Sequence, residues 1–136
     1  MNFFKSSPLF LAILLVINIS CTDQNDELTE AKSLQGLWVD IQTGTDTLVF
    51  DYWGDGDEVM YLNRAKELRD GHLLPKSKAG SYDYELLKNE ISLRWHLSSN
   101  SAFNQFSFEK NGDQLVIGNF YDDTASGTKM TFKKID

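Results

Sequence analysis

From Gly36 to the end of the chain, hydrophobic and polar residues alternate with a period of two rather than with the 3.6-residue period of an amphipathic helix. Residues 90–97 show this best, because Ile91, Leu93 and Trp95 alternate with polar residues. Glycine, asparagine and aspartate residues separate such stretches and indicate turns. The pattern therefore predicts an all-β domain. We expect eight strands, at residues 36–42, 46–52, 58–63, 81–87, 90–97, 102–110, 114–121 and 128–135.

The first of two short turns that fix strand pairing is expected at Lys88-Asn89. A two-residue loop there brings apolar residues of the flanking strands together on one face, and a shift by one residue would move all of them into water. The expected pairs are Leu86 with Ile91, Tyr84 with Leu93, and Tyr82 with Trp95.

The second short turn is expected at Asn111-Gly112, a dipeptide typical of type I′ hairpin turns. Its register also gathers apolar residues on one face. The expected pairs are Phe108 with Leu115, Phe106 with Ile117, and Asn104 with Asn119.

Connections between the expected strands are short at one end of the domain and mostly longer at the other. The first group is residues 53–57, 88–89 and 111–112. The second group is residues 43–45, 64–80, 98–101 and 122–127. This asymmetry predicts an eight-stranded antiparallel up-and-down barrel with a tight base and an open rim. The chain enters its first strand at the tight end, so the rim should point away from whatever holds the N-terminus.

Inward-facing residues near the open rim form the candidate ligand site. Asn104 and Asn119, as cross-strand partners, would place two amides among aromatic side chains, which can orient a ligand in a mainly apolar cavity. The alternative is that the aromatic side chains fill a small barrel completely. The candidate ligand-binding residues are Leu48, Tyr82, Trp95, Asn104, Phe106, Asn119, Tyr121 and Met130.

Trp38 and Asp40 raise a local conflict in the first expected strand. They are two residues apart, so an inward-facing Trp38 carries Asp40 inward as well. A buried carboxylate is costly unless it is paired. We therefore expect either a bulge in this strand or a wet cavity beside Asp40.

A basic segment occupies the long connection at residues 64–80, although the whole chain has a net charge of −7. The sequence predicts a helical turn over Arg64–Asp70 that Gly71 ends. One interpretation is a basic lid that contacts an anionic head group or an acidic protein partner. The alternative is a solvated loop whose charges pair with nearby acids. In the first interpretation, the contacting residues are Arg64, Lys66 and Arg69.

Composition narrows the classes of function. The chain has 136 residues, of which 41% are hydrophobic and 24% charged, and this indicates one globular domain. The net charge of −7 argues against a nucleic-acid partner, which needs a basic face. Cys21 is the single cysteine, which excludes an internal disulfide and, with only two histidines, argues against a Cys/His metal site. We expect no cofactor.

The sequence offers no catalytic constellation. His72 and His96 lie far apart along the chain, and no serine or cysteine occupies a recognisable nucleophile elbow. The acidic residues at 51–58 do not have the spacing of an EF-hand calcium loop. We therefore expect neither enzyme activity nor a metal site.

The N-terminus has the features of an export signal. Lys5 precedes an apolar run at residues 9–17, which is too short to span a bilayer as a helix. Ser20-Cys21 then resembles a bacterial lipobox, which implies cleavage before Cys21 and its acylation, for example with palmitate. The alternative is an ordinary secretory signal that leaves Cys21 free. The expected divisions are a signal peptide at 1–20, an acylated cysteine and acidic tether at 21–33, and the barrel domain at 34–136.

Several segments resemble a known family. Gly36-Leu37-Trp38 matches the Gly-x-Trp motif that opens lipocalins, and residues 106–121 and 131–135 resemble small lipocalin-like lipoproteins of Gram-negative bacteria. The resemblance covers residues 33–136. It implies an eight-stranded barrel and binding of a small apolar ligand.

Together these observations favour a lipocalin-like protein of the cell envelope, anchored through acylated Cys21 and most simply in the outer membrane. We expect it to bind a small hydrophobic or amphiphilic molecule in its barrel. The alternative is a protein-interaction module, such as an inhibitor, an immunity-type protein or an envelope subunit, that acts through the rim loops.

Overall fold

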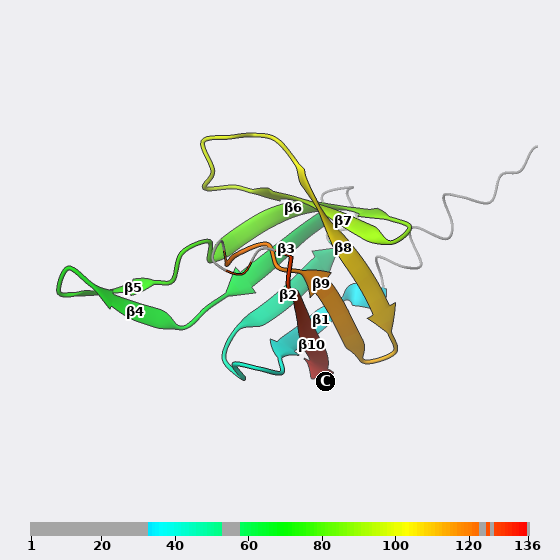
Figure 1. The fold of residues 1–136 in the computed structure, drawn as a ribbon, viewed down its shortest axis with the longest axis horizontal. Coiled ribbons are helices and arrows are strands. Elements are labelled where there is room, and N and C mark those ends of the chain that lie inside the picture. The colour runs from blue at the N-terminus through cyan, green and yellow to red at the C-terminus, as the bar shows by residue number, and fades with distance from the viewer. Residues whose placement is uncertain (1–32, 53–57, 123–124, 126, 136) are drawn as a thin grey trace, which may run out of the picture.

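The strands of the domain close into an antiparallel β-barrel (Figure 1). The computed structural model describes residues 33–52, 58–122, 125 and 127–135. Eight strands of this part close the barrel in the order β1-β10-β9-β8-β7-β6-β3-β2, and β4 and β5 form a separate hairpin. The strands are β1 (Gly36–Asp40), β2 (Thr47–Tyr52), β3 (Glu58–Asn63), β4 (Lys66–Arg69), β5 (His72–Pro75), β6 (Gly80–Leu87), β7 (Glu90–Trp95), β8 (Asn104–Asn111), β9 (Gln114–Gly118) and β10 (Lys129–Ile135).

This architecture confirms the predicted all-β, eight-stranded up-and-down barrel. Each barrel strand pairs with the next one along the chain, apart from the inserted hairpin, and β10 closes the barrel against β1. The closing register places Leu37 opposite Ile135 and Asp40 opposite Phe132. The largest errors in the predicted boundaries lie at the open end, where β7 ends at Trp95 and β9 ends at Gly118.

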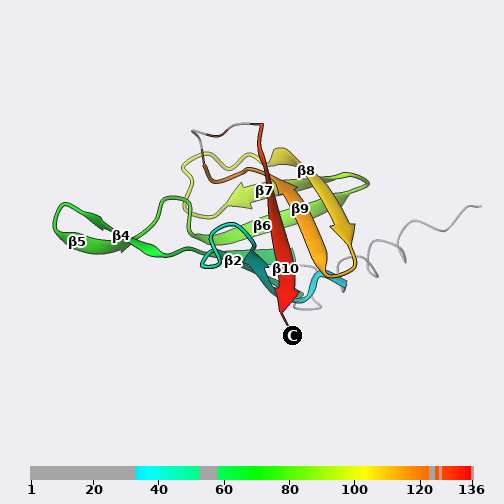
Figure 2. The same cartoon turned by 60° about the horizontal axis from the view of Figure 1, so that its bottom comes forward.

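The predicted helical turn over Arg64–Asp70 is wrong, because this segment forms the β4–β5 hairpin. Asp70 and Gly71 both adopt positive φ angles, 51° and 78°, as a type I′ hairpin turn requires. The Asp-Gly dipeptide therefore turns the chain between two strands instead of ending a helix. Figures 1 and 2 both show the hairpin projecting away from the barrel.

The two predicted hairpin registers had different outcomes. In the β6–β7 hairpin, Tyr82 lies opposite Trp95 and the other two expected pairs are also found. In the β8–β9 hairpin the prediction was wrong, since Phe108 lies opposite Ile117. Gly112, with a φ of 58°, occupies the first loop position, while Asn111 stays in the strand. The partners therefore shift by two residues, which keeps the apolar side chains on the same face.

The shifted register also overturns the predicted pairing of Asn104 with Asn119. Asn104 lies opposite Leu93 of β7, and β9 ends at Gly118, before Asn119 is reached. The two amides are therefore not cross-strand partners.

The barrel interior holds the hydrophobic core, and Trp38 lies fully buried within it. Its indole Nε1 donates a hydrogen bond of 2.8 Å to the backbone oxygen of Leu34. Asp40 also faces inward and is only 3% exposed. Its carboxylate accepts hydrogen bonds from the backbone N–H groups of Gln42 (3.4 Å) and Thr43 (3.0 Å). The local conflict in β1 is thus resolved by backbone donors in the following turn.

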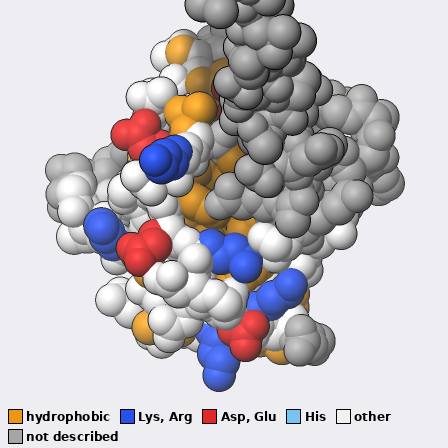
Figure 3. Space-filling view, turned by 90° about the vertical axis from the view of Figure 1, so that its right-hand side faces the viewer, with side chains coloured by type: hydrophobic (Ala, Val, Ile, Leu, Met, Phe, Trp, Pro, Cys, Tyr) orange, Lys and Arg blue, Asp and Glu red, His pale blue; other side chains and the backbone are white. Residues whose placement is uncertain are grey.

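The end of the barrel with the short turns carries mixed charge. Acidic and basic side chains are interspersed there around an apolar strip (Figure 3).

The N-terminal predictions, including the signal peptide, Cys21 and the tether, lie outside the described residues, as does the whole turn at 53–57. Among the residues that are described, no helix is long and apolar enough to span a membrane.

Candidate functional site

A cavity of about 540 Å³ opens at the long-loop end of the barrel, beside the start of β8. The register between β8 and β9 runs only from Asn111 opposite Gln114 to Phe108 opposite Ile117, although β8 begins at Asn104. Beyond that point, β8 pairs with β7 on its other side, and the chain after Gly118 leaves the sheet. The cavity lies where these two segments separate.

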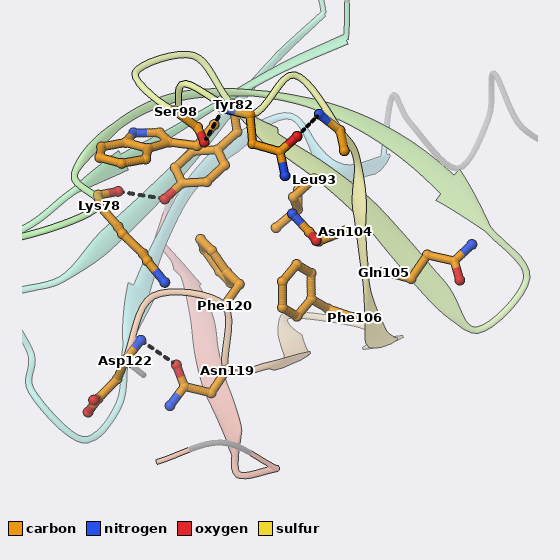
Figure 4. Close-up of a pocket in the computed structure, with 13 residues that line it drawn as sticks. Lys78, Tyr82, Leu93, Ser98, Asn104, Gln105, Phe106, Asn119, Phe120 and Asp122 are labelled. Atoms are coloured by element: carbon orange, nitrogen blue, oxygen red, sulfur yellow. Dashed lines mark hydrogen bonds between the residues drawn. The ribbon is translucent and has the colours of Figure 1, made fainter. Parts of the chain in front are cut away.

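Four aromatic side chains form one wall of the cavity. The rings of Tyr82 and Trp95 stack with centroids 6.4 Å apart, and Phe120 meets Tyr82 edge-on at 5.4 Å. Phe106 contacts Phe120 at 5.9 Å. In Figure 4 the rings of Tyr82, Phe106 and Phe120 face the same space. Trp95 and Phe106 are only partly buried, so this wall presents aromatic surface to the cavity.

Polar side chains surround the mouth. Asn104, at the start of β8, is exposed and lines the cavity. The amide of Asn119 instead shapes the loop after β9, because its Oδ1 accepts from the backbone N–H of Asp122 at 2.9 Å and its Nδ2 donates to Thr128 Oγ1 at 3.1 Å. The remaining polar residues of the lining are Lys78, Ser98, Asn100, Gln105 and Asp122. Figure 4 shows Gln105 pointing away from the aromatic rings.

The structure brings five of the eight candidate ligand-binding residues to this cavity. They are Tyr82, Trp95, Asn104, Phe106 and Asn119. The other three, Leu48, Tyr121 and Met130, are buried in the core and do not line it. Leu48 lies opposite Trp38 and Leu62 in the middle of the sheet, which explains its complete burial.

Phe120 is the most important lining residue that the sequence prediction missed. The expected strand 114–121 alternated Ile117, Asn119 and Tyr121 inward, which placed Phe120 outside the barrel. Because β9 ends at Gly118, the alternation of the strand stops there, and the side chain of Phe120 lines the cavity. A Gly-Asn dipeptide is a turn signal, and it could have marked this end of the strand.

Arg64, predicted as a partner contact, is used inside the protein. Its Nε lies 3.1 Å from Oδ2 of the buried Asp46, and its Nη1 donates to the backbone oxygen of Ser77 at 2.7 Å. Its guanidinium also lies over the ring of Tyr121, 4.3 Å from the centroid. Of the three basic candidates, only Lys66 and Arg69 are exposed.

Two tyrosines beside the cavity stay protonated. Burial raises the pKa of Tyr82, whose hydroxyl donates a 2.6 Å hydrogen bond to the backbone oxygen of Lys78. Burial, and then the negative charges of Asp46 and Asp40, raise the pKa of Tyr121. Both phenols therefore act as neutral donors at physiological pH.

A second polar cluster lies on the outer face of β6 and β7, and sequence reasoning missed it. Ser81 Oγ lies 2.9 Å from His96 Nδ1, and His96 Nε2 lies 2.6 Å from Asp83 Oδ1. Arg94 Nε donates to Asp83 Oδ2 at 2.7 Å. The β6–β7 register contained the signal, because the loop at 88–89 places Ser81 opposite His96 and Asp83 opposite Arg94.

Asp83 is ionised in this outer cluster. Partial burial favours its neutral form, but hydrogen bonds from His96 and Arg94 outweigh burial and lower the pKa of Asp83 below its ordinary value. The cluster borders a depression of about 500 Å³ on the outside of the barrel, which shares Trp95 and Ser98 with the lining of the cavity. Its hydrogen bonds link β6 to β7 and to His96 directly after β7.

Within the described part of the chain, no group of three or more His, Cys, Asp or Glu side chains is placed to hold a metal ion. Comparisons with known protein families, with curated proteins and with solved structures found no match to this chain.

Proposed function

We propose that this protein binds a small amphiphilic molecule in the cavity at the open end of its barrel. The observation that carries the proposal is the partly exposed aromatic wall, with Trp95 and Phe106 facing a space of about 540 Å³. Small-molecule sites are typically hollows of about 300–1,000 Å³ with an apolar lining and a few placed polar groups.

The arrangement of the lining supports an amphiphile rather than a purely apolar ligand. The aromatic rings offer a surface for an alkyl chain or a flat ring. The amide of Asn104 at the mouth offers hydrogen-bond donors to a polar head. Ser81, Asp83 and His96 of the outer cluster do not line this cavity, which supports a binding role rather than an enzymatic one.

A fluorescent amphiphile, 1-anilinonaphthalene-8-sulfonate, tests the cavity. Residues 22–136, which contain all eight strands of the closed barrel, are used for this test. We expect the probe to bind, and Trp95→Ala to weaken its affinity about tenfold or more, because the variant removes part of the aromatic wall. Asn104→Trp should also weaken binding by filling the mouth.

The matched control is Tyr61→Ala, which removes an aromatic side chain that is 37% exposed and does not line the cavity. It should leave probe affinity unchanged. Equal affinities for the parent protein, Trp95→Ala and Asn104→Trp would place the probe elsewhere and refute the proposal.

We further propose that the barrel is a lipoprotein of the cell envelope, held in a membrane through Cys21. The support is the sequence alone: a short apolar run followed by Ser20 and the single cysteine. In a Gram-negative host, an alkyne analogue of palmitate should label the protein, and Cys21→Ser should abolish the label and release the protein from membranes. Labelling that survives Cys21→Ser would contradict the anchor.

A further inference from the structure

The β4–β5 hairpin presents an apolar face outside the barrel. Leu68 is 75% exposed and Leu73 is 63% exposed, and the two lie opposite each other in the register. Lys66 lies opposite Pro75 on the same face. One side of this small ribbon therefore carries two leucines and a proline, with a lysine beside them.

The hairpin is held in this position by contacts at both ends. Arg69, next to the Asp70-Gly71 turn, donates from Nη2 to the backbone oxygen of Pro75 at 3.0 Å, and so links the free end of the hairpin to its base. At its base, Lys76 N–H donates to Ala65 O at 3.3 Å. Arg64 ties the base to the barrel through Asp46 and Ser77. Because an isolated two-stranded hairpin is marginally stable in water, these contacts keep the apolar face displayed.

The charge around this face differs from that of the rest of the chain. Lys66, Arg69 and Lys76 lie on or beside the hairpin, against Glu67, which pairs with Arg69 at 3.3 Å, and Asp70 in the turn, so residues 66–76 carry a net charge of +1. The whole chain, by contrast, has a net charge of −7. An anionic surface would therefore attract the hairpin and repel the remainder of the protein.

We propose that the apolar face of the β4–β5 hairpin inserts into the boundary between head groups and acyl chains of a bilayer that contains anionic lipid. Leu68 and Leu73 enter the apolar layer, and Lys66 and Lys76 lie at the level of the lipid phosphates. The hairpin is a projecting ribbon, and a fluid bilayer accepts such a shape without a complementary pocket (Figure 2). This inference does not depend on the cavity ligand or on acylation at Cys21, and it reverses the sequence-based expectation that the open end of the barrel points away from the membrane.

Vesicle binding by residues 22–136 tests the proposal without the apolar run at 9–17 or Cys21. The protein should sediment with vesicles of phosphatidylcholine mixed with phosphatidylglycerol, and much less with phosphatidylcholine alone. Leu68→Ser/Leu73→Ser should lower the partition coefficient by about tenfold or more. Leu97→Ser is the matched control, because Leu97 is 72% exposed but lies outside the hairpin.

A second pair of variants separates local charge from net charge. Lys66→Glu/Lys76→Glu should lower binding to the mixed vesicles severalfold. Lys88→Glu/Lys133→Glu makes the same change in net charge away from the hairpin and should have a much smaller effect. Equal losses from the two double variants would contradict a contact through the hairpin.

Tryptophan fluorescence at position 73 reports insertion of the hairpin directly, as a gain of signal rather than a loss of binding. Leu73→Trp should add fluorescence that shifts to the blue with mixed vesicles, relative to the parent protein. No shift, or no binding of the parent protein to mixed vesicles, would overturn the proposal. Crosslinking from position 73 in native envelopes that captured an acidic protein, and no lipid, would also overturn it.

Discussion

At the scale of single residues, alternation predicted which way a side chain faces but not what fills the space in front of it. Tyr82 and Tyr121 were both assigned inward, and both are buried. Only Tyr82 reaches the cavity, because Tyr121 packs under Arg64 and against Phe120. The contact between Arg64 and Tyr121 joins segments far apart in the chain, and a strand pattern does not contain it.

At Asp83 the charge of one side chain depends on two neighbours, Arg94 in β7 and His96 directly after that strand. His96 and Arg94 hydrogen-bond to its two oxygens and lower its pKa. A carboxyl group with a lowered folded-state pKa stabilises the fold above its unfolded pKa, and this stabilisation is lost as the pH falls through the folded value.

We therefore expect Asp83→Asn to lower the free energy of unfolding by about 1–2 kcal/mol at neutral pH. The difference from the parent protein should begin to shrink as the pH falls below about 4, the ordinary pKa of aspartate. Urea unfolding of both proteins across this range measures it. A difference that stays constant with pH would show that Asp83 does not act through its charge.

At the scale of elements, the sequence predicted the eight barrel strands and their order, because period-two alternation is strong in each. It failed where turns decide the outcome. Asp70-Gly71 forms a hairpin instead of ending a helix, and Gly112 takes the first loop position of the β8–β9 turn. Both errors arise because one or two residues adopt a positive φ angle, and the alternation of hydrophobic and polar residues carries no information about φ.

The separation between β8 and β9 is the element-level feature that makes the cavity. Gly118, the last residue of β9, lies tightly against β8: a Cβ there would be 3.0 Å from Ser107 Oγ and 3.2 Å from its backbone nitrogen. The absence of a side chain at this position lets the two strands approach just below the cavity.

Gly118→Ala should therefore force β8 and β9 apart and lower the free energy of unfolding by about 1–3 kcal/mol. It should also weaken binding of the fluorescent probe. Gly71→Ala is the comparison variant, because a Cβ there would meet nothing within 4 Å and the residue belongs to the separate hairpin. Gly71→Ala should destabilise only the β4–β5 hairpin, which would be measured as faster amide hydrogen exchange at Leu68 and Leu73. Unchanged barrel stability and probe binding in Gly118→Ala would contradict a requirement for the close approach of β8 and β9 at this position.

At the scale of the whole molecule, the two ends of the barrel differ as the loop lengths predicted. The end with short turns carries mixed charge, and the other end carries the cavity and the projecting hairpin (Figures 1 and 3). The sequence predicted this polarity because loop length is read directly from the spacing of strands. The opening between β8 and β9 was not predicted, since it depends on where pairing stops.

The measurement that tests the central claim most directly is native mass spectrometry of residues 22–136, purified gently from the host. The account predicts a bound small molecule of defined mass that is displaced by 1-anilinonaphthalene-8-sulfonate and is absent from Asn104→Trp. A bound molecule that Asn104→Trp retains would lie outside the cavity. The bare mass of the chain, together with no binding of the probe, would contradict a ligand-binding barrel.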